Sequence, residues 1–248
     1  MLHDPPDPAK LNLICLPYAG ASADFYRRWQ TALPGVKLHP VRLPGRGRDI
    51  GLPPIDDMER LTDLILSQLS GLFHTRFALL GTSMGGWIAF RLAQKLCLAS
   101  GRHPASLFVC SAACPADRAL IPRLAGLSDA QTLAVMATFN PASRNILQHP
   151  ELASLFLPIL RADFELCLNW MPDESYKLPI PIYGFRGQRD NIALEASMQQ
   201  WQTLTTGIFR LATVPGDHFF IENPDPGFFN HLLELISFGK GDTHPRRE

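Results

Sequence analysis

The sequence predicts an α/β fold in which helices flank a mostly parallel central sheet, with residues 1–248 forming a single domain. Short apolar runs alternate with segments of helical spacing along most of the chain, a pattern typical of parallel strands joined by crossover helices. One apolar run leads through a glycine-rich turn directly into a helical segment. A long stretch, residues 115–177, shows helical patterns only.

Six short apolar runs are predicted to be the strands of this sheet. They cover residues 11–17, 36–43, 77–80, 107–110, 180–185 and 209–214. In the fifth run, Pro179 and Pro181 are confined to the start, where a strand tolerates proline.

Helical spacing predicts three helices around the sheet, over residues 56–71, 84–99 and 226–236. In the second of them, the polar side chains of Arg91, Gln94 and Lys95 form one stripe and the other residues are mainly apolar. We therefore expect this helix to pack deep against the sheet.

The composition argues against several classes of protein. The chain has 248 residues, 46% of them hydrophobic, and a formal net charge of zero. This balance does not suggest a nucleic-acid partner or an anionic membrane surface, and no apolar run is long enough to cross a bilayer. The first ten residues contain no apolar segment of the kind found in secretory signals.

The cysteines indicate a reducing compartment. There are five of them, an odd number, and no C-x-x-C motif occurs, so neither a zinc site nor a redox site is predicted. We expect buried free thiols and a cytoplasmic location.

Residues 81–86, Gly-Thr-Ser-Met-Gly-Gly, match the G-x-S-x-G pattern of a nucleophile elbow. The pattern alone is weak, but here it follows an apolar strand and begins a helix, as the elbow of an α/β-hydrolase fold requires. Gly81 and Gly85 leave room for the close approach of strand and helix. Ser83 is therefore predicted to present a nucleophilic hydroxyl beside the positive end of the helix. The alternative is a turn that merely uses small residues.

A nucleophilic serine needs a histidine base and a carboxylate that orients it. Of the eight histidines, only His218 lies in a loop just after a late strand, where this fold places the base. Asp190 follows the preceding strand, which gives the chain order Ser, Asp, His. Asp217 is the rival carboxylate, but adjacent residues on an extended loop point apart. The predicted catalytic triad is Ser83, Asp190 and His218.

The oxyanion of the tetrahedral intermediate needs two backbone N–H donors. Met84, the residue after the nucleophile, is expected to provide one. The small, glycine-bearing loop of residues 17–22 is expected to provide the other from Ala19. Such a site predicts a serine hydrolase that works through an acyl-enzyme and needs no metal or organic cofactor.

The helical stretch of residues 115–177 interrupts the alternation of strands and helices. Ser128 and Gln131 form a capping box, an Asn-Pro pair is expected to end the helix that follows, and Pro158 is expected to begin another. Because strands resume directly afterwards, we predict a helical lid inserted over the active site. Ordinary core-packing helices are the alternative.

Five motifs occur in order along the chain: Leu-Pro-Tyr-Ala-Gly-Ala-Ser at 16–22, Leu-Pro-Gly-Arg-Gly at 43–47, the elbow at 81–86, Leu-Pro-Ile-Leu-Arg-Ala-Asp at 157–163 and Gly-Asp-His-Phe-Phe at 216–220. Together they resemble the type II thioesterases, stand-alone editing enzymes that accompany non-ribosomal peptide synthetases and polyketide synthases. The resemblance runs from about residue 11 to residue 238. Two positions depart from the family: Thr82, where histidine is common, and Ala21, where a second glycine is common.

The resemblance implies hydrolysis of acyl thioesters on the phosphopantetheine arm of acyl or peptidyl carrier proteins, in antibiotic or siderophore biosynthesis. The implied partner is such a carrier protein, and we expect the enzyme itself to be a monomer. Lys37, Arg42, Arg46 and Arg48 cluster near the second strand and could meet an acidic carrier or the phosphate of its arm. Solvated surface charges are the alternative.

Two other functions stay open at this point. The same triad would serve a carboxylesterase that acts on small esters. A non-catalytic binding module on a hydrolase scaffold is the other possibility, since fold does not determine function. Such a module would be expected to lose at least one triad residue, and all three are present.

Overall fold

The computed structural model describes residues 5–118, 121–139, 149–173 and 175–238. Six strands form one sheet in the order β2-β1-β3-β4-β5-β6, and every neighbouring pair is parallel. The strands are β1 (Leu11–Leu16), β2 (Val36–Pro40), β3 (Phe77–Thr82), β4 (Leu107–Cys110), β5 (Ile182–Gly187) and β6 (Phe209–Val214). The prediction of a parallel sheet flanked by helices is confirmed, and each predicted run contains a strand.

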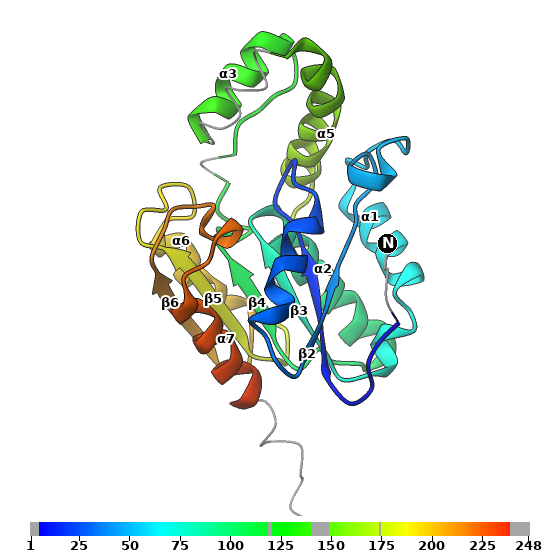
Figure 1. Cartoon of the computed structure of the whole chain (residues 1–248), viewed down its shortest axis with the longest axis vertical. Helices are drawn as coiled ribbons and strands as arrows, with labels where there is room; N and C mark the ends of the chain where they lie inside the picture. The colour runs from blue at the N-terminus through cyan, green and yellow to red at the C-terminus, as the bar shows by residue number, and fades with distance from the viewer. Residues whose placement is uncertain (1–4, 119–120, 140–148, 174, 239–248) are drawn as a thin grey trace, which may run out of the picture.

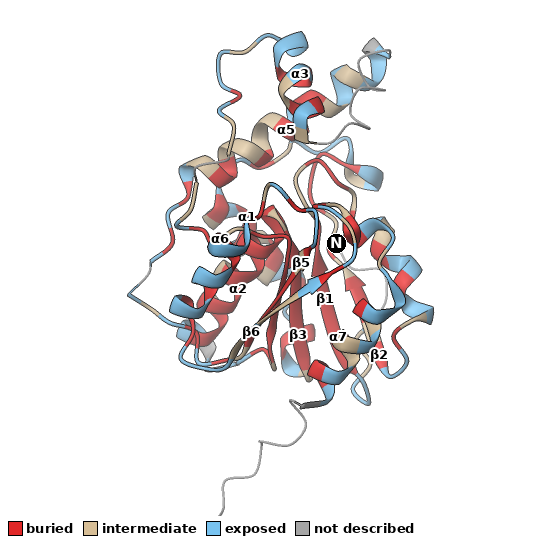
Figure 2. Ribbon diagram, turned by 90° about the vertical axis from the view of Figure 1, so that its left-hand side faces the viewer, coloured by how far each residue is buried: buried red, intermediate tan, exposed pale blue. Residues whose placement is uncertain are grey.

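Helices cover both faces of the sheet (Figure 1). Successive side chains of β1 point to opposite faces. Ile14 and Leu16 join the core formed with α1 (Met58–Gln68) and α2 (Met84–Ser100). Leu13 and Cys15 join a second core, formed with the 3-10 helix η1 (Ala23–Thr31) and the last helix, α7 (Pro226–Phe238). Figure 2 shows the strands buried between helices whose outer sides are exposed.

The strand order places the functional loops together. Strand β1 lies between β2 and β3. The chain therefore continues from β1 to one side, to β2, and then returns to the other side, to β3. In parallel sheets, ligands bind beside such a reversal of strand order, at the carboxyl ends of the strands. The loops after β1, β3, β5 and β6 all leave the sheet at this edge because the strands are parallel. In this order, the loops carry Ala19, Ser83, Asp190 and His218. These are the predicted oxyanion donor, nucleophile, orienting carboxylate and base.

Two long helices lie between β4 and β5, and in the described part of residues 115–177 no strand occurs. They are α3 (Asp129–Phe139) and α5 (Pro150–Asn169), and both lie beyond the carboxyl edge of the sheet (Figure 1). The capping box is present: the Ser128 N–H donates to Gln131 Oε1 at 2.9 Å, and the Gln131 N–H donates to Ser128 Oγ at 3.3 Å. The Asn140-Pro141 pair expected to end this helix lies outside the described residues.

The expectation that Pro158 begins a helix is wrong. Pro158 lies inside α5, which begins at Pro150. A proline there removes one helical hydrogen bond and costs about 3 kcal/mol. Its neighbours Leu157, Ile159 and Leu160 are all buried, and burying each such side chain contributes about 1.5–3 kcal/mol. Packing therefore keeps the helix continuous through the proline.

Several short helices in the described residues were not predicted from the sequence. They include η1, η2 (Gly47–Asp49), η3 (Leu72–His74), α6 (Glu195–Gln199), η5 (Gln200–Leu204) and η6 (Phe220–Glu222). The buried residues of η1 are Ala23, Tyr26 and Trp29, a spacing of three that fits a 3-10 helix. The ring of Trp29 packs edge-on against Phe228 of α7, so this short helix anchors the last helix to the sheet.

The five cysteines are free and buried, as predicted. Within the described residues, no helix has the length and apolar character needed to span a bilayer.

We predict that Phe228→Ala lowers the free energy of unfolding by about 3–5 kcal/mol, measured by urea denaturation. Phe228 is 1% exposed, and its ring contacts Trp29, Phe185 and Phe220. Leu98→Ala is the control, because Leu98 is 61% exposed and its loss should change stability by no more than about 0.5 kcal/mol. Equal effects of the two substitutions would contradict the assignment of this core.

Candidate active site

Ser83 occupies a strained turn between β3 and α2. Its backbone has φ 51° and ψ −119°, a conformation with positive φ that is rare for residues other than glycine. A Cβ at Gly81 would lie 2.0 Å from the Gly85 carbonyl oxygen, and a Cβ at Gly85 would lie 2.3 Å from the Leu16 carbonyl oxygen. Glycine is therefore required at both positions for β1, β3 and α2 to approach this closely, which is the geometry of a nucleophile elbow.

His218 and Asp190 are hydrogen-bonded, as the predicted triad requires. Nδ1 of His218 lies 3.1 Å from each carboxylate oxygen of Asp190. The N–H groups of Ile192 and Ala193 also donate to Asp190 Oδ1, both at 2.9 Å. The carboxylate is thus fixed from two sides and directs one face toward the imidazole ring.

The electrostatics of Asp190 suit an orienting carboxylate. Burial by itself raises the pKa of this side chain, but the hydrogen bond and charge of His218, with the Ile192 N–H, hold the pKa below its ordinary value. Asp190 therefore stays ionised at neutral pH. The rival Asp217 is exposed, and its Oδ1 accepts the N–H of Phe219, so its carboxylate is engaged on its own loop.

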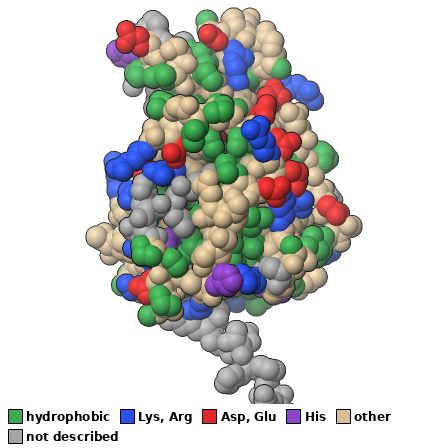
Figure 3. Space-filling model, turned by 90° about the vertical axis from the view of Figure 1, so that its right-hand side faces the viewer, with side chains coloured by type: hydrophobic (Ala, Val, Ile, Leu, Met, Phe, Trp, Pro, Cys, Tyr) green, Lys and Arg blue, Asp and Glu red, His purple; other side chains and the backbone are tan. Residues whose placement is uncertain are grey.

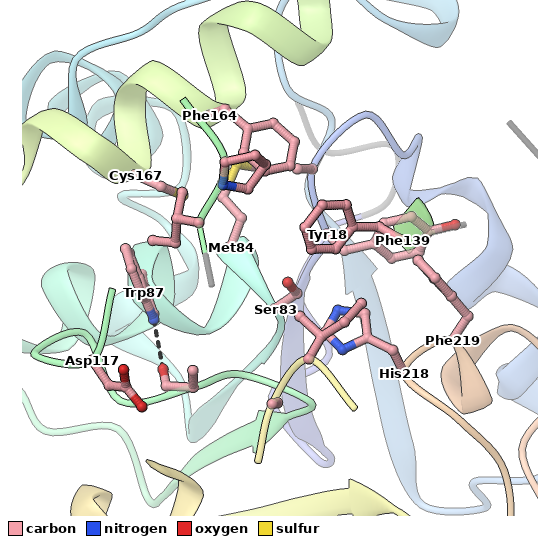
Figure 4. A pocket seen from close by; sticks show the side chains of 16 residues that line it. Tyr18, Ser83, Met84, Trp87, Asp117, Phe139, Phe164, Cys167, His218 and Phe219 are labelled. Carbon is pink, nitrogen blue, oxygen red and sulfur yellow. Dashed lines mark hydrogen bonds between the residues drawn. The ribbon is translucent and has the colours of Figure 1, made fainter. Parts of the chain in front are cut away.

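A cavity of about 120 Å³ is lined by both Ser83 and His218. Ser83, His218, Ala19 and Met84 all lie on its wall, and Figure 4 shows Ser83 and His218 facing the same space. Asp190 is 2% exposed and lies behind His218, outside the lining. Most of the remaining lining is apolar and includes Trp87, Phe139, Phe164, Cys167, Ile192 and Phe219.

The loop after β1 forms a tight turn beside the cavity. The Ala21 N–H donates to the Tyr18 carbonyl oxygen at 3.1 Å, and Gly20 has φ +79°, which is the conformation of the third residue in a type II turn. The Tyr18 hydroxyl donates to Glu222. Burial and this contact raise the pKa of Tyr18, so the hydroxyl keeps its proton. The loop with Ala19 is thereby tied to the segment that follows His218.

Thr82 and Ala21 are the two departures from the family pattern. The Thr82 hydroxyl is buried and lies 2.8 Å from the Tyr26 hydroxyl, which in turn donates to the Leu16 carbonyl oxygen at 2.9 Å. The Thr82 side chain therefore links the elbow to the core beneath η1. Nothing in the structure explains alanine rather than glycine at position 21.

Arg46 is neither a docking residue nor a solvated surface charge. It is 5% exposed, and its guanidinium forms two hydrogen bonds of 2.7 Å with the carboxylate of Asp163 in α5. This buried fork was missed because the two residues are 117 positions apart. One signal was available in the sequence: Arg46 and Asp163 each lie in a motif that resembles the type II thioesterases.

The other basic residues do not identify a docking surface. Arg42 pairs with Asp49 at 3.2 Å, and Arg48 is exposed. Acidic and basic side chains lie next to one another along the right-hand part of the face in Figure 3. Ion pairs between exposed side chains contribute about 0–1 kcal/mol each, and the Arg42–Asp49 pair is partly buried.

The comparisons with known proteins identify the family of this chain. Residues 11–237 match the thioesterase domain family, so the chain belongs to this family of hydrolases that act on thioesters. It is 32% identical to the gramicidin S biosynthesis protein GrsT of Aneurinibacillus migulanus, over 93% of this chain and 88% of that protein. The predicted relation to the type II thioesterases is confirmed.

Solved structures of type II thioesterases share the fold. The thioesterase RedJ from the prodiginine pathway of Streptomyces coelicolor is 32% identical with a TM-score of 0.80, over 96% of this chain and 94% of that one. YbtT, the type II thioesterase of the yersiniabactin pathway, is 26% identical with a TM-score of 0.84, over 96% of this chain and 98% of that one.

We predict that Asp190→Asn lowers kcat for thioester hydrolysis by roughly 10⁴-fold, because an amide does not stabilise the imidazolium and selects the wrong tautomer. Steady-state kinetics with a soluble thioester measure this. The matched control is Asp217→Asn, which should keep kcat within about twofold. The reverse ranking of the two variants would assign the orienting role to Asp217.

Asp190 should also make stability depend on pH. Because its folded pKa lies below the ordinary value of 3.8, the carboxylate contributes stability above about pH 4 that is lost as the pH falls through the folded pKa. The difference in unfolding free energy between the wild type and Asp190→Asn should be larger at pH 5 than at pH 3, measured by urea denaturation. A difference that grows toward pH 3 would contradict the lowered pKa.

Proposed function

We propose that the chain is a type II thioesterase that hydrolyses acyl thioesters from the phosphopantetheine arm of carrier proteins in a non-ribosomal peptide or polyketide pathway. One observation carries the proposal: in a thioesterase-family chain, Ser83 and His218 line one cavity, and His218 is bonded to a buried carboxylate. Relatives of this chain belong to such pathways, which supports the choice of a carrier-bound substrate.

In the proposed reaction, His218 removes the proton of the Ser83 hydroxyl, and Ser83 Oγ attacks the thioester carbonyl. The backbone N–H groups of Ala19 and Met84 stabilise the oxyanion. The N–H of Met84 is available because the first turn of a helix has no acceptor for it within the helix. Asp190 holds the histidine tautomer and stabilises the imidazolium.

Collapse of the intermediate breaks the carbon–sulfur bond and leaves the acyl group on Ser83. The departing sulfur takes the proton from His218, and its thiol has an ordinary pKa of about 8.5, so it leaves far more readily than an alkoxide. Water then attacks the acyl-enzyme with His218 as the base, and the proton returns to Ser83 as the carboxylic acid departs.

The cavity favours a short, mainly apolar acyl group. Its volume of about 120 Å³ is below the roughly 300–1,000 Å³ of pockets for drug-sized ligands. The lining residues Phe139, Phe164 and Cys167 come from α3 and α5. We therefore propose that these helices are a lid inserted within a single domain.

The partner in this proposal is an acyl or peptidyl carrier protein, and the enzyme acts as a monomer in the cytoplasm. Its five cysteines are free and buried, which fits a reducing compartment.

The test uses a carrier protein loaded with a short acyl group through its phosphopantetheine arm, with an aryl ester assayed in parallel. We expect rapid release of the acyl group by the wild type and a loss of roughly 10⁴–10⁶-fold in Ser83→Ala. Ser67→Ala is the matched control, because Ser67 is exposed and its hydroxyl donates to the Leu64 carbonyl of its own helix. Ester cleavage without carrier turnover would favour the carboxylesterase. No turnover of either would favour the binding module.

A further inference from the structure

Asp163 lies where three distant segments of the chain meet. It belongs to α5 and is 1% exposed. Its Oδ1 accepts Nη2 of Arg46 at 2.7 Å, and its Oδ2 accepts both Nη1 of Arg46 and the backbone N–H of Gly20, again at 2.7 Å each. One buried carboxylate thus joins α5, the loop after β2 and the turn after β1.

We propose that Asp163 and Arg46 are positioning residues for the oxyanion turn, and that they make this turn depend on the placement of α5. Gly20 directly follows Ala19, whose N–H is the proposed donor to the oxyanion. Asp163 and Arg46 have this role only if Ala19 is such a donor, as the proposed function requires.

The type II turn explains why an acceptor is needed. The central peptide of such a turn, here between Ala19 and Gly20, can flip and convert the turn to type I, in which φ of the third residue is negative. Gly20 has φ +79° and, as glycine, has little intrinsic preference for either sign. The Gly20 N–H bonded to Asp163 selects the observed orientation, so the neighbouring Ala19 peptide is held in place.

Arg46 is the buried ion-pair partner of the acceptor Asp163. A buried carboxylate without a partner is strongly unfavourable, whereas the planar guanidinium satisfies both oxygens in a bidentate fork. Asp163 accepts two hydrogen bonds of 2.7 Å from Arg46, and its Oδ2 also accepts the N–H of Gly20. The pair therefore acts as a unit, and its effect on the reaction passes through Gly20.

The face of α5 that carries Asp163 also packs on the turn. A Cβ at Gly20 would lie 2.9 Å from Leu160 and 3.1 Å from Phe156. These two residues and Asp163 recur at intervals of four and three, which places them on one side of the helix. Figure 1 shows α5 reaching the loop that follows β1. A shift of α5 away from this loop would break the hydrogen bond from the Gly20 N–H to Asp163. The oxyanion site is therefore complete only when α5 packs against this loop.

The decisive variant replaces both charges, Arg46→Met with Asp163→Leu. Buried ion pairs replaced by apolar residues of similar volume often keep or gain stability, so this variant should stay folded by urea denaturation. Gly20 would have no acceptor, and a displacement of about 1 Å at a reacting group can cost 10²-fold. We expect kcat for a soluble short-chain thioester to fall at least tenfold, with KM within about threefold of the wild type.

A purely structural ion pair predicts a different result. A stable double variant with wild-type kcat would overturn the positioning role. The conservative variant Arg46→Lys keeps a cation beside Asp163 and leaves the acceptor for Gly20, so it should retain more than half of kcat. If the double variant does not fold, Asp163→Asn decides: its single amide oxygen must serve both Arg46 and Gly20, and wild-type kcat in this variant would overturn the proposal.

The matched control is a second Arg–carboxylate fork. Arg91 Nε and Nη2 donate to the two Glu59 oxygens at 2.7 and 2.8 Å and join α2 to α1 without lining the cavity. The variant Arg91→Gln with Glu59→Gln should keep kcat within about twofold. An equal loss in this control would show that the effect is not specific to the oxyanion turn.

The rate at which a fluorophosphonate modifies Ser83 separates this inference from the proposed function. The phosphonyl oxygen occupies the oxyanion position, and no carrier is needed. Slower modification in the double variant than in the wild type, by at least tenfold, supports the positioning role. Equal rates overturn it and leave the triad intact. A wild type that is not modified at Ser83 overturns both.

Discussion

The backbones of Gly85 and Leu16 pack in close contact, and the rest of the site depends on this contact. A side chain at position 85 would lie 2.3 Å from the Leu16 carbonyl oxygen, and one at position 81 would lie 2.0 Å from the Gly85 carbonyl oxygen. Because glycine stands at both places, the end of β1, the end of β3 and the start of α2 come together. Ser83 and the loop with Ala19 are neighbours for this reason.

Two buried aspartates then fix the groups around Ser83 in the same way. Asp190 accepts N–H groups from Ile192 and Ala193 and orients His218. Asp163 accepts N–H groups from Arg46 and orients the Gly20 peptide. In each case several donors satisfy the oxygens of a buried carboxylate, which reduces the cost of burying it. Asp190 contacts the proposed base, and Asp163 contacts the turn proposed to hold the oxyanion.

Much of the fold could be predicted because the signals are local. Each strand is a short apolar run, and the elbow shows itself as a serine between glycines where a strand gives way to a helix. The positions of Ser83, Asp190 and His218 directly after predicted strands, together with their chain order, selected residues that the structure brings to one edge of the sheet.

The remaining features depend on contacts that the local sequence does not encode. The fork between Arg46 and Asp163 joins positions 117 residues apart, so a residue expected at the surface is buried. Pro158 would normally begin a helix, but the burial of its neighbours carries α5 through it. In η1 the buried residues Ala23, Tyr26 and Trp29 recur every three positions, which fits a 3-10 helix, and no helix was predicted there.

The most direct test of the central claim is to capture the acyl-enzyme. The protein is mixed with a carrier that bears a short acyl thioester, quenched with acid within milliseconds, digested and examined by mass spectrometry. The account predicts that the acyl mass lies on the peptide that contains Ser83, together with an equal amount of free carrier thiol. An acyl group on another residue, or carrier hydrolysis with the Ser83 peptide always unmodified, would contradict it.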